Sequence, residues 1–167
     1  MLRNSLKLAV AGALLVASAT AGAATTKTTT MTVSAAVAAN CNVQAGNLSF
    51  GTYDASAVKT GSADVTVRCS KNTLYAVKLS AGGGSYGQRL LSDGTNTLQY
   101  NLFTESGLGT VWGDGTGSTK VVNGKGLGMS NSGAITHTVY GELPNSATNQ
   151  DAPAGSYGDS ITVTVEY

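Results

Sequence analysis

The chain has 167 residues, with ten basic and nine acidic side chains, a formal charge of +1 and only 11% charged residues. This length suits a single domain, and the nearly even charge leaves no basic surplus to bind the phosphates of nucleic acid. Average soluble domains carry roughly 25% charged residues. The low charge therefore indicates a surface of Gly, Ser, Thr, Asn and Ala with weak mutual repulsion, which favours assembly.

Residues 1–23 have the three parts of a secretory signal peptide. Arg3 and Lys7 give the start a positive charge, an apolar run follows over Leu8–Ala19, and Ala-Gly-Ala forms a small-residue cleavage site before Ala24. The run is shorter than the roughly 20 apolar residues that a membrane-spanning helix needs. We therefore expect an exported protein without membrane insertion.

The segment after the signal peptide, residues 24–36, leads into an alternating run with high β-propensity. Four apolar side chains of this run point to one face of an extended strand: Met31, Val33, Ala35 and Val37. The run could be the first strand of the protein's own sheet, or a strand meant for another molecule. Residues 37–43 would suffice for a first strand, which leaves residues 26–35 partly surplus.

Cys41 and Cys69 are the only cysteines. In an oxidising compartment such a pair most simply forms one disulfide, which should stabilise the fold by about 3–4 kcal/mol through loop closure. A metal site would require further ligands, and the single histidine of the sequence cannot supply a matching pair. We therefore expect one disulfide, no metal site and no cofactor.

Alternating apolar and polar runs recur along the whole chain after the signal peptide, and helical periodicity is absent. The runs are Met31–Val37, Asn42–Phe50, Ala63–Cys69, Leu74–Ser80, Leu98–Phe103, Thr136–Gly141 and Ile161–Tyr167. Turn residues such as Asp-Gly and Asn-Gly separate them. Seven short runs at this spacing predict an all-β protein built as a sandwich.

Residues 107–133 are rich in glycine and are the least strand-like part of the chain. Thr110–Trp112 and Lys120–Val122 could form a short hairpin there, and a disordered loop is the alternative. Trp112 could stack on a sugar, as in a lectin, although a lid over one end of the sandwich is the more frequent role of such a residue.

The sequence is poor in groups for catalysis. His137 is the only histidine, and its strand parity with Ile135 and Val139 favours a packed side chain over a catalytic base. The nine acidic residues are scattered singly, so that no pair is placed for general acid and base work. We expect no catalytic residues and no enzyme activity.

The last run ends with the sequence itself. Ile161, Val163, Val165 and Tyr167 share one face of this strand, and the sequence stops inside it. We expect the strand to form an open sheet edge that requires a partner.

Several short motifs occur in a characteristic order. They are Cys41, Leu48-Ser49-Phe50-Gly51-Thr52-Tyr53, Val65-Thr66-Val67-Arg68-Cys69, Arg89-Leu90-Leu91, Leu98-Gln99-Tyr100-Asn101-Leu102, Val111-Trp112-Gly113-Asp114-Gly115, Thr138-Val139-Tyr140-Gly141 and Gly155-Ser156-Tyr157-Gly158-Asp159. Together they resemble the spore coat protein U domain family, which includes subunits of archaic chaperone-usher pili. The resemblance covers essentially the whole chain after the signal peptide.

The resemblance implies an immunoglobulin-like sandwich over residues 37–167 that lacks its final strand. A periplasmic chaperone would hold the subunit and an outer-membrane usher would polymerise it, with the extension 24–36 of one subunit filling the groove of another copy. The implied donor-strand side chains are Met31, Val33, Ala35 and Val37. The implied acceptor edge consists of Ile161, Val163, Val165 and Tyr167.

The function implied by the resemblance is that of a structural subunit in a surface fibre, which supports adhesion and biofilm formation. A tip adhesin, a carbohydrate-binding module and a secreted coat protein of the same family are the alternatives. The sequence also leaves open whether the extension acts in another subunit or folds back onto its own.

Overall fold

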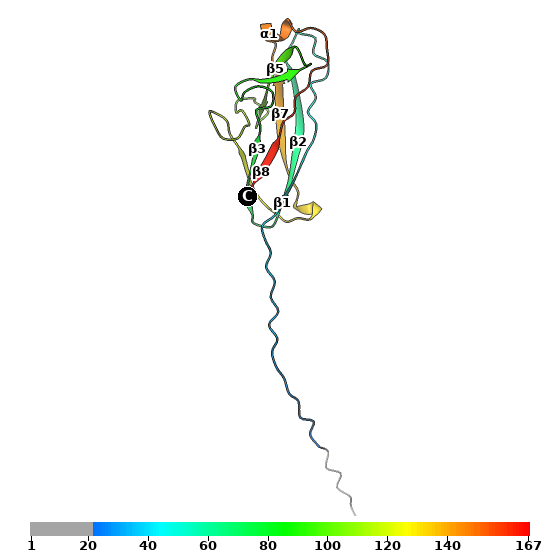
Figure 1. Cartoon of the computed structure of the whole chain (residues 1–167), viewed down its shortest axis with the longest axis vertical. Coiled ribbons are helices and arrows are strands. Elements are labelled where there is room, and N and C mark those ends of the chain that lie inside the picture. The colour runs from blue at the N-terminus through cyan, green and yellow to red at the C-terminus, as the bar shows by residue number, and fades with distance from the viewer. Residues whose placement is uncertain (1–21) are drawn as a thin grey trace, which may run out of the picture. The chain divides into compact units, whose positions relative to one another are not determined.

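The computed structural model describes residues 22–167, so the predicted signal peptide, residues 1–23, lies almost entirely outside the described part of the chain. The chain divides into two units, one ending at Ala35 and the other spanning Ala36–Tyr167. The second unit holds every helix and strand of the described residues (Figure 1).

Among the described residues, five strands form a larger sheet in the order β1-β2-β7-β5-β4, and three form a smaller sheet in the order β6-β3-β8. The larger sheet consists of β1 (Cys41–Ala45), β2 (Lys59–Cys69), β7 (Ile135–Leu143), β5 (Thr97–Phe103) and β4 (Arg89–Ser92). The smaller sheet consists of β6 (Val122–Lys125), β3 (Leu74–Leu79) and β8 (Val163–Glu166). All strand pairs in both sheets are antiparallel.

Two short helical elements occur within residues 22–167, the 3-10 turn η1 (Asn131–Gly133) and the helix α1 (Ala147–Gln150). Buried Asn149 fastens α1 to β5, because its side chain accepts a hydrogen bond from Gln99 N at 2.7 Å and donates one to Gln99 O at 2.9 Å. No helix in this part of the chain has the length and apolar character that crossing a membrane requires.

Both sheets contribute to one hydrophobic core, because β2, β3, β5 and β7 alternate between buried and more exposed side chains. The core side chains are Val65, Val67, Cys69, Tyr75, Val77, Leu79, Leu98, Tyr100, Leu102, Trp112, Val139 and Leu143. The all-β, two-sheet prediction is confirmed.

Two of the predicted runs differ from the observed strands, and two observed strands have no predicted run. The run Met31–Val37 carries no strand in the described chain, since a strand exists only where a neighbouring segment receives its backbone hydrogen bonds. The run Asn42–Phe50 forms a ladder only as far as Ala45. The two short strands β4 and β6 are not among the predicted runs, because four residues are too few for alternation to be distinctive.

The glycine-rich region 107–133 folds onto the sandwich and does not form the predicted short hairpin. Trp112 meets Lys120 in a parallel bridge, and β6 begins only at Val122. The Trp112 side chain is completely buried, and its Nε1 donates a hydrogen bond to Val77 O at 3.0 Å. A buried indole cannot stack on a sugar, so Trp112 belongs to the core.

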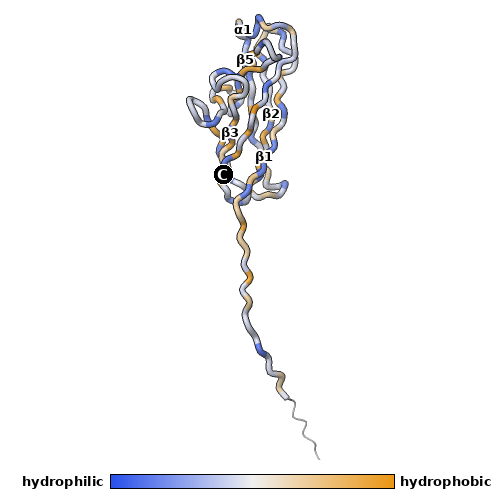
Figure 2. Tube along the Cα trace, viewed as in Figure 1, coloured by the Kyte–Doolittle hydropathy of each residue, from blue (hydrophilic) through white to orange (hydrophobic). Residues whose placement is uncertain are grey.

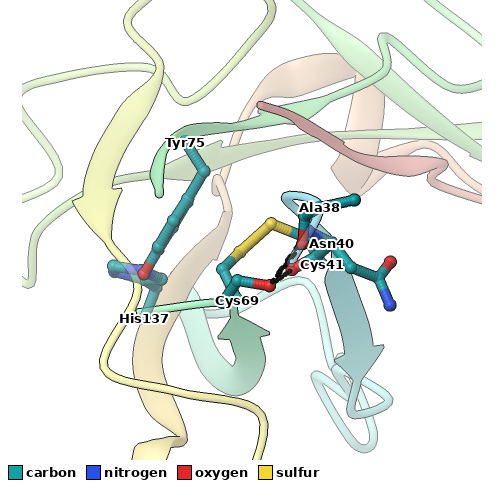
Figure 3. The surroundings of a disulfide bond; sticks show 7 residues. Ala38, Asn40, Cys41, Cys69, Tyr75 and His137 are labelled. Carbon is teal, nitrogen blue, oxygen red and sulfur yellow. Dashed lines mark hydrogen bonds between the residues drawn. A yellow bond between two sulfur atoms is a disulfide. The ribbon is translucent and has the colours of Figure 1, made fainter. Parts of the chain in front are cut away.

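The predicted disulfide between Cys41 and Cys69 is confirmed. The two cysteines are ladder partners at one end of the pairing between β1 and β2. Ser70 holds the backbone just before β1, because its N–H donates to Asn40 O at 2.8 Å and its Oγ donates to Ala38 O at 3.3 Å (Figure 3). Asn40 N in turn donates to Ser70 Oγ at 3.1 Å.

Candidate functional site

An open groove of about 1110 Å³ lies between two segments of chain that border the sandwich. Its first wall is the segment Ala45–Ala55, which continues from β1, and its second wall is the segment Ala152–Val163, which leads into β8. The floor is formed by side chains of the core itself: Val65, Leu79, Leu98, Tyr100, Leu102, Val139 and Leu143. Since β1 and β8 are edge strands of different sheets, no strand of the described chain lies between the two walls.

The first wall is held mainly by side chains. Gly46 donates a backbone hydrogen bond to β2 at 2.8 Å, but residues 47–58 make no backbone-to-backbone hydrogen bond within the described chain. Leu48 and Phe50 pack against the core, and the Phe50 ring meets Tyr100 edge to face with 6.0 Å between centroids. The unpaired N–H and C=O groups of this wall are therefore available to another strand.

The first wall packs closely against two paired glycines. Gly61 of β2 and Gly141 of β7 are partners in the ladder. A Cβ atom at Gly61 would lie 2.8 Å from Ser49 O, and one at Gly141 would lie 3.0 Å from side-chain atoms of both Leu48 and Phe50. Any larger residue at these positions would push the wall away from the sheet.

The second wall is held by backbone hydrogen bonds. β8 pairs with β3, with Val163 opposite Leu79 and Glu166 opposite Ala76. Further along the wall, Gly158 exchanges two backbone hydrogen bonds with Ser92, at 2.8 and 2.9 Å. The other edge of β8 has no ladder partner in the described chain.

A buried arginine strengthens the second wall. Arg89 is completely buried and donates hydrogen bonds to Ser80 O at 2.9 and 3.1 Å, to Trp112 O at 2.8 Å and to Asn101 Oδ1 at 2.6 Å. Ser80 then binds the second wall at Thr162 in two ways. Its N–H donates to Thr162 O at 3.0 Å, and its Oγ accepts from Thr162 N at 2.9 Å.

Asp159 is a second point at which this wall is fixed. Its Oδ2 accepts a hydrogen bond from the Tyr100 hydroxyl at 2.6 Å, and its Oδ1 accepts one from Gly83 N at 3.0 Å. Burial, together with the hydrogen bond to Asp159, raises the pKa of Tyr100, so the hydroxyl remains a donor at neutral pH. Burial also lowers the pKa of Arg89.

The predicted acceptor residues do not all have the same position. Ile161 and Val163 line the groove. Val165 packs against the core next to it, whereas the side chain of Tyr167 is 60% exposed and is not part of the lining.

The predicted donor residues lie on the segment before β1 and are exposed. Met31, Val33 and Val37 are 83%, 81% and 91% exposed, and Ala35 is exposed as well. Figure 2 shows this segment as mostly white to orange, which marks it as apolar for a chain without strand partners. Large apolar side chains that are exposed in this number favour a role in binding.

His137 lies away from the groove, near the disulfide (Figure 3). Its Nε2 is 2.9 Å from the Tyr75 hydroxyl oxygen, and the two rings meet edge to face with 5.8 Å between centroids. Burial lowers the pKa of His137, so the imidazole is neutral near pH 7. Within residues 22–167, no group of three or more His, Cys, Asp or Glu side chains could hold a metal ion.

A family model described as the Spore Coat Protein U domain (SCPU) matches residues 27–164. The chain belongs to this family. The match includes the exposed segment Met31–Val37, both cysteines and both walls of the groove.

A solved structure also resembles this SCPU protein. It is a chain in the crystal structure of the CsuC–CsuE chaperone-tip adhesion subunit pre-assembly complex from archaic chaperone-usher Csu pili of Acinetobacter baumannii, with 27% sequence identity and a TM-score of 0.52. The match covers 78% of the SCPU chain and 40% of that chain, so the SCPU protein spans less than half the length of its structural relative. No curated protein matches the sequence significantly.

Sequence reasoning missed the features that shape the groove. Arg89 stands in the sequence only as part of Arg-Leu-Leu, and an arginine next to two leucines in a short run is the one hint of burial. The pairing of Gly61 with Gly141 has no sequence signal, because the two residues belong to different strands. The alternation of the first wall predicts a strand that continues from Asn42 to Phe50, and it carries no sign that the ladder ends earlier.

Proposed function

We propose that this SCPU protein is a structural subunit of a chaperone-usher pilus that assembles by donor-strand exchange. The observation that carries the proposal is the groove of about 1110 Å³, which opens onto the hydrophobic core between two unpaired edges. An immunoglobulin-like sandwich that lacks its final strand would have such a groove. The extension, residues 24–36, then acts as the donor and residues 37–167 as the acceptor domain.

A strand in the groove would gain ladder hydrogen bonds at the walls and place alternate side chains on the floor. Met31, Val33, Ala35 and Val37 of one subunit would face the floor of the next. Ile161, Val163, Val165 and Tyr167 would form the edge that receives them. Since every subunit has one donor and one groove, the contact is head-to-tail and propagates as a fibre.

A groove that exposes the core needs a cover before assembly, because an apolar surface of this kind promotes aggregation. A periplasmic chaperone is the proposed cover and an outer-membrane usher the proposed site of polymerisation. The similarity to a chaperone-subunit pre-assembly complex supports the chaperone. Export by the signal peptide would place the fibre at the cell surface, where it would serve adhesion and biofilm formation as a structural protein, without catalysis.

The test is to co-express the protein with its chaperone and usher and to compare unheated and boiled samples on a denaturing gel. We expect a ladder of subunit multiples that disappears on boiling. Deleting residues 26–35 should abolish the ladder but leave the chaperone complex intact, because the groove is unchanged. Fibres of normal length from the deleted chain would contradict the proposal.

A matched pair of substitutions tests the parity of the donor strand. Val33→Asp places a charge where the floor requires an apolar group and should abolish assembly. Thr32→Asp places the same charge one residue earlier, on the opposite face, and should be tolerated. Equal effects of the two substitutions would show that residues 31–37 do not bind as a strand.

A further inference from the structure

We propose that the Cys41–Cys69 disulfide protects the groove of each subunit from tension applied to that subunit's own extension. The inference rests on the proposed function, in which the extension is bound by a neighbouring subunit while the groove holds a donor strand. Each contact between two subunits is a joint of the fibre, and the two joints of one subunit then act on one short stretch of its chain. The extension leads into β1, and β1 leads directly into the first wall.

β1 by itself is a weak anchor for such a force. It is an edge strand of five residues, none of them fully buried, and it pairs only with β2. Tension from the extension would arrive at its first residue. Ladder hydrogen bonds of an antiparallel pair run perpendicular to the strands, so a pull across the sheet at this end opens one residue pair after another and breaks the hydrogen bonds singly instead of together.

The first wall would follow β1. Residues 47–58 have no backbone-to-backbone hydrogen bond within the described chain, and side chains such as Leu48 and Phe50 hold this segment. Removing the segment would expose the floor and take away one of the two edges that bind the donor strand. Tension on one joint of the fibre would in this way open the next joint.

The disulfide interrupts this path at its first residue. Cys41 is the start of β1 and the ladder partner of Cys69, so a force that reaches residue 41 passes through the sulfur atoms into β2. β2 is an interior strand that pairs with β1 on one side and, over nine residue pairs, with β7 on the other. Cys69 is 1% exposed, so the force enters the core of the sandwich.

The position of the disulfide is what matters. A bridge at the other end of β1, near Ala45, would leave the whole strand open to separation from β2 before the covalent bond carried any force. Ser70 adds hydrogen bonds to Ala38 and Asn40 at the same point (Figure 3). The covalent and the hydrogen-bonded contacts thus lie together where the extension meets the domain.

The experiment is to stretch single fibres of the wild-type protein and of the Cys41→Ser/Cys69→Ser variant with optical tweezers. We expect the variant to lengthen by roughly 30 Å per subunit as residues 41–58 detach, because this segment extends to about 60 Å at roughly 3.3–3.6 Å per residue and the fold already holds its ends about 30 Å apart along β2. The variant should then break at a lower force. Wild-type fibres should break without this step. Val77→Ala, which weakens the core on β3 outside this path, is the control and should produce no such step.

The outcomes separate this inference from the proposed function. Equal lengthening and equal breaking force in both fibres would overturn the role of the disulfide, while the existence of fibres would uphold the pilus subunit. If neither form makes fibres, the proposed function fails. In that case single molecules of the wild-type protein and of the variant are pulled between their two ends. An early detachment step that is identical in the two proteins would overturn the role of the disulfide.

If the Cys41→Ser/Cys69→Ser variant does not fold, reduced wild-type fibres take its place in the stretching experiment. Fibres assembled in the oxidised state are reduced afterwards, and thiol labelling of Cys41 and Cys69 confirms the reduction. Reduced fibres should show the same lengthening step as the variant. Reduced fibres that stretch and break like oxidised ones would overturn the inference.

Discussion

The two walls of the groove have the same alternation of apolar and polar residues, but different interactions hold them in place. In the first wall, Leu48 and Phe50 fill a space next to two glycines, and the backbone beyond Gly46 is unpaired within the described chain. In the second wall, β8 pairs with β3, and Thr162 and Asp159 are tied to the buried core. Alternation therefore decides which side chains face the core, whereas ladder partners decide how firmly a segment is fixed.

This difference gives the groove one side that is fixed by a backbone ladder and one side that depends mainly on side-chain contacts. A donor strand would therefore meet a preformed edge at β8 and would supply the missing backbone partners of the first wall. Substitutions that act on one wall and spare the other can test this view.

The largest effect is expected when Arg89 is replaced. Arg89→Met removes the donor from Trp112 O in a buried contact and from Ser80 O in a partly buried one, and it takes one of two donors from Asn101 Oδ1. A buried acceptor left without a partner costs about 1–3 kcal/mol, and the buried Arg89 side chain loses its packing as well. We expect a loss of about 3 kcal/mol or more in the free energy of unfolding, measured by urea denaturation. Arg89→Lys should not restore stability, because one ammonium group cannot replace the planar guanidinium.

The control for Arg89 is another arginine of the sandwich. Arg68 lies on β2, and its buried Nε has no hydrogen-bond partner among the described residues. Arg68→Met should therefore cost far less than Arg89→Met. If the two substitutions destabilised the protein equally, the hydrogen bonds of Arg89 would not be the reason that the second wall is firm.

A smaller effect is expected at the glycines against which the first wall packs. Gly61→Ala would bring a Cβ atom within 2.8 Å of the backbone oxygen of Ser49, so the wall must shift outward. We expect a loss of about 1–3 kcal/mol in the free energy of unfolding, as for other overpacked sites. Binding of a peptide with the sequence of residues 26–37, measured by calorimetry, should weaken as well.

Gly158→Ala is the matched control on the second wall. A Cβ atom added at Gly158 would have no heavy atom within 4 Å beyond its chain neighbours, and the residue has no positive φ angle, so alanine fits there. Stability and peptide binding should stay as in the wild type. A loss of binding in this control that equals the loss in Gly61→Ala would remove the distinction between the walls.

The smallest effect concerns pH and lies outside both walls. Burial lowers the pKa of His137 below its usual 6.5, so the unfolded chain takes up the proton first as the pH falls. The contribution of neutral His137 to the free energy of unfolding is complete above pH 6.5. It is lost as the pH falls through the lowered pKa that His137 has in the folded protein. Urea midpoints should therefore decrease as the pH falls below about 6.5.

His137→Gln is the control for this prediction, because an amide can still bind the Tyr75 hydroxyl and does not titrate. The variant should keep its urea midpoint over this pH range. Asp54, Asp93 and Asp114 have pKa values lowered mainly by hydrogen bonds, so their contributions are lost only below about pH 4. A variant that remained as sensitive to acid as the wild type would assign the effect to other groups.

Much of the fold could be predicted from local patterns. The runs Leu74–Ser80 and Leu98–Phe103 correspond to β3 and β5 almost residue for residue, because their alternation matches the period of a half-buried strand. The disulfide followed from there being only two cysteines. The alternation of Asn42–Phe50 predicts one continuous strand, but the ladder ends at Ala45 and the wall beyond it is unpaired within the described chain. Alternation is the same in both parts, so it cannot show where the pairing ends.

The sequence by itself determined the alternation of the strands, the pairing of Cys41 with Cys69 and the presence of an apolar segment before β1, because each depends on residues that are neighbours in the chain or on a simple count. Only the tertiary structure decided which core side chains form the floor of the groove, how Arg89 reaches Ser80 and Trp112, and that Gly61 lies opposite Gly141. These contacts join residues that are distant in sequence. Their energies depend on burial and close spacing, which no local pattern contains.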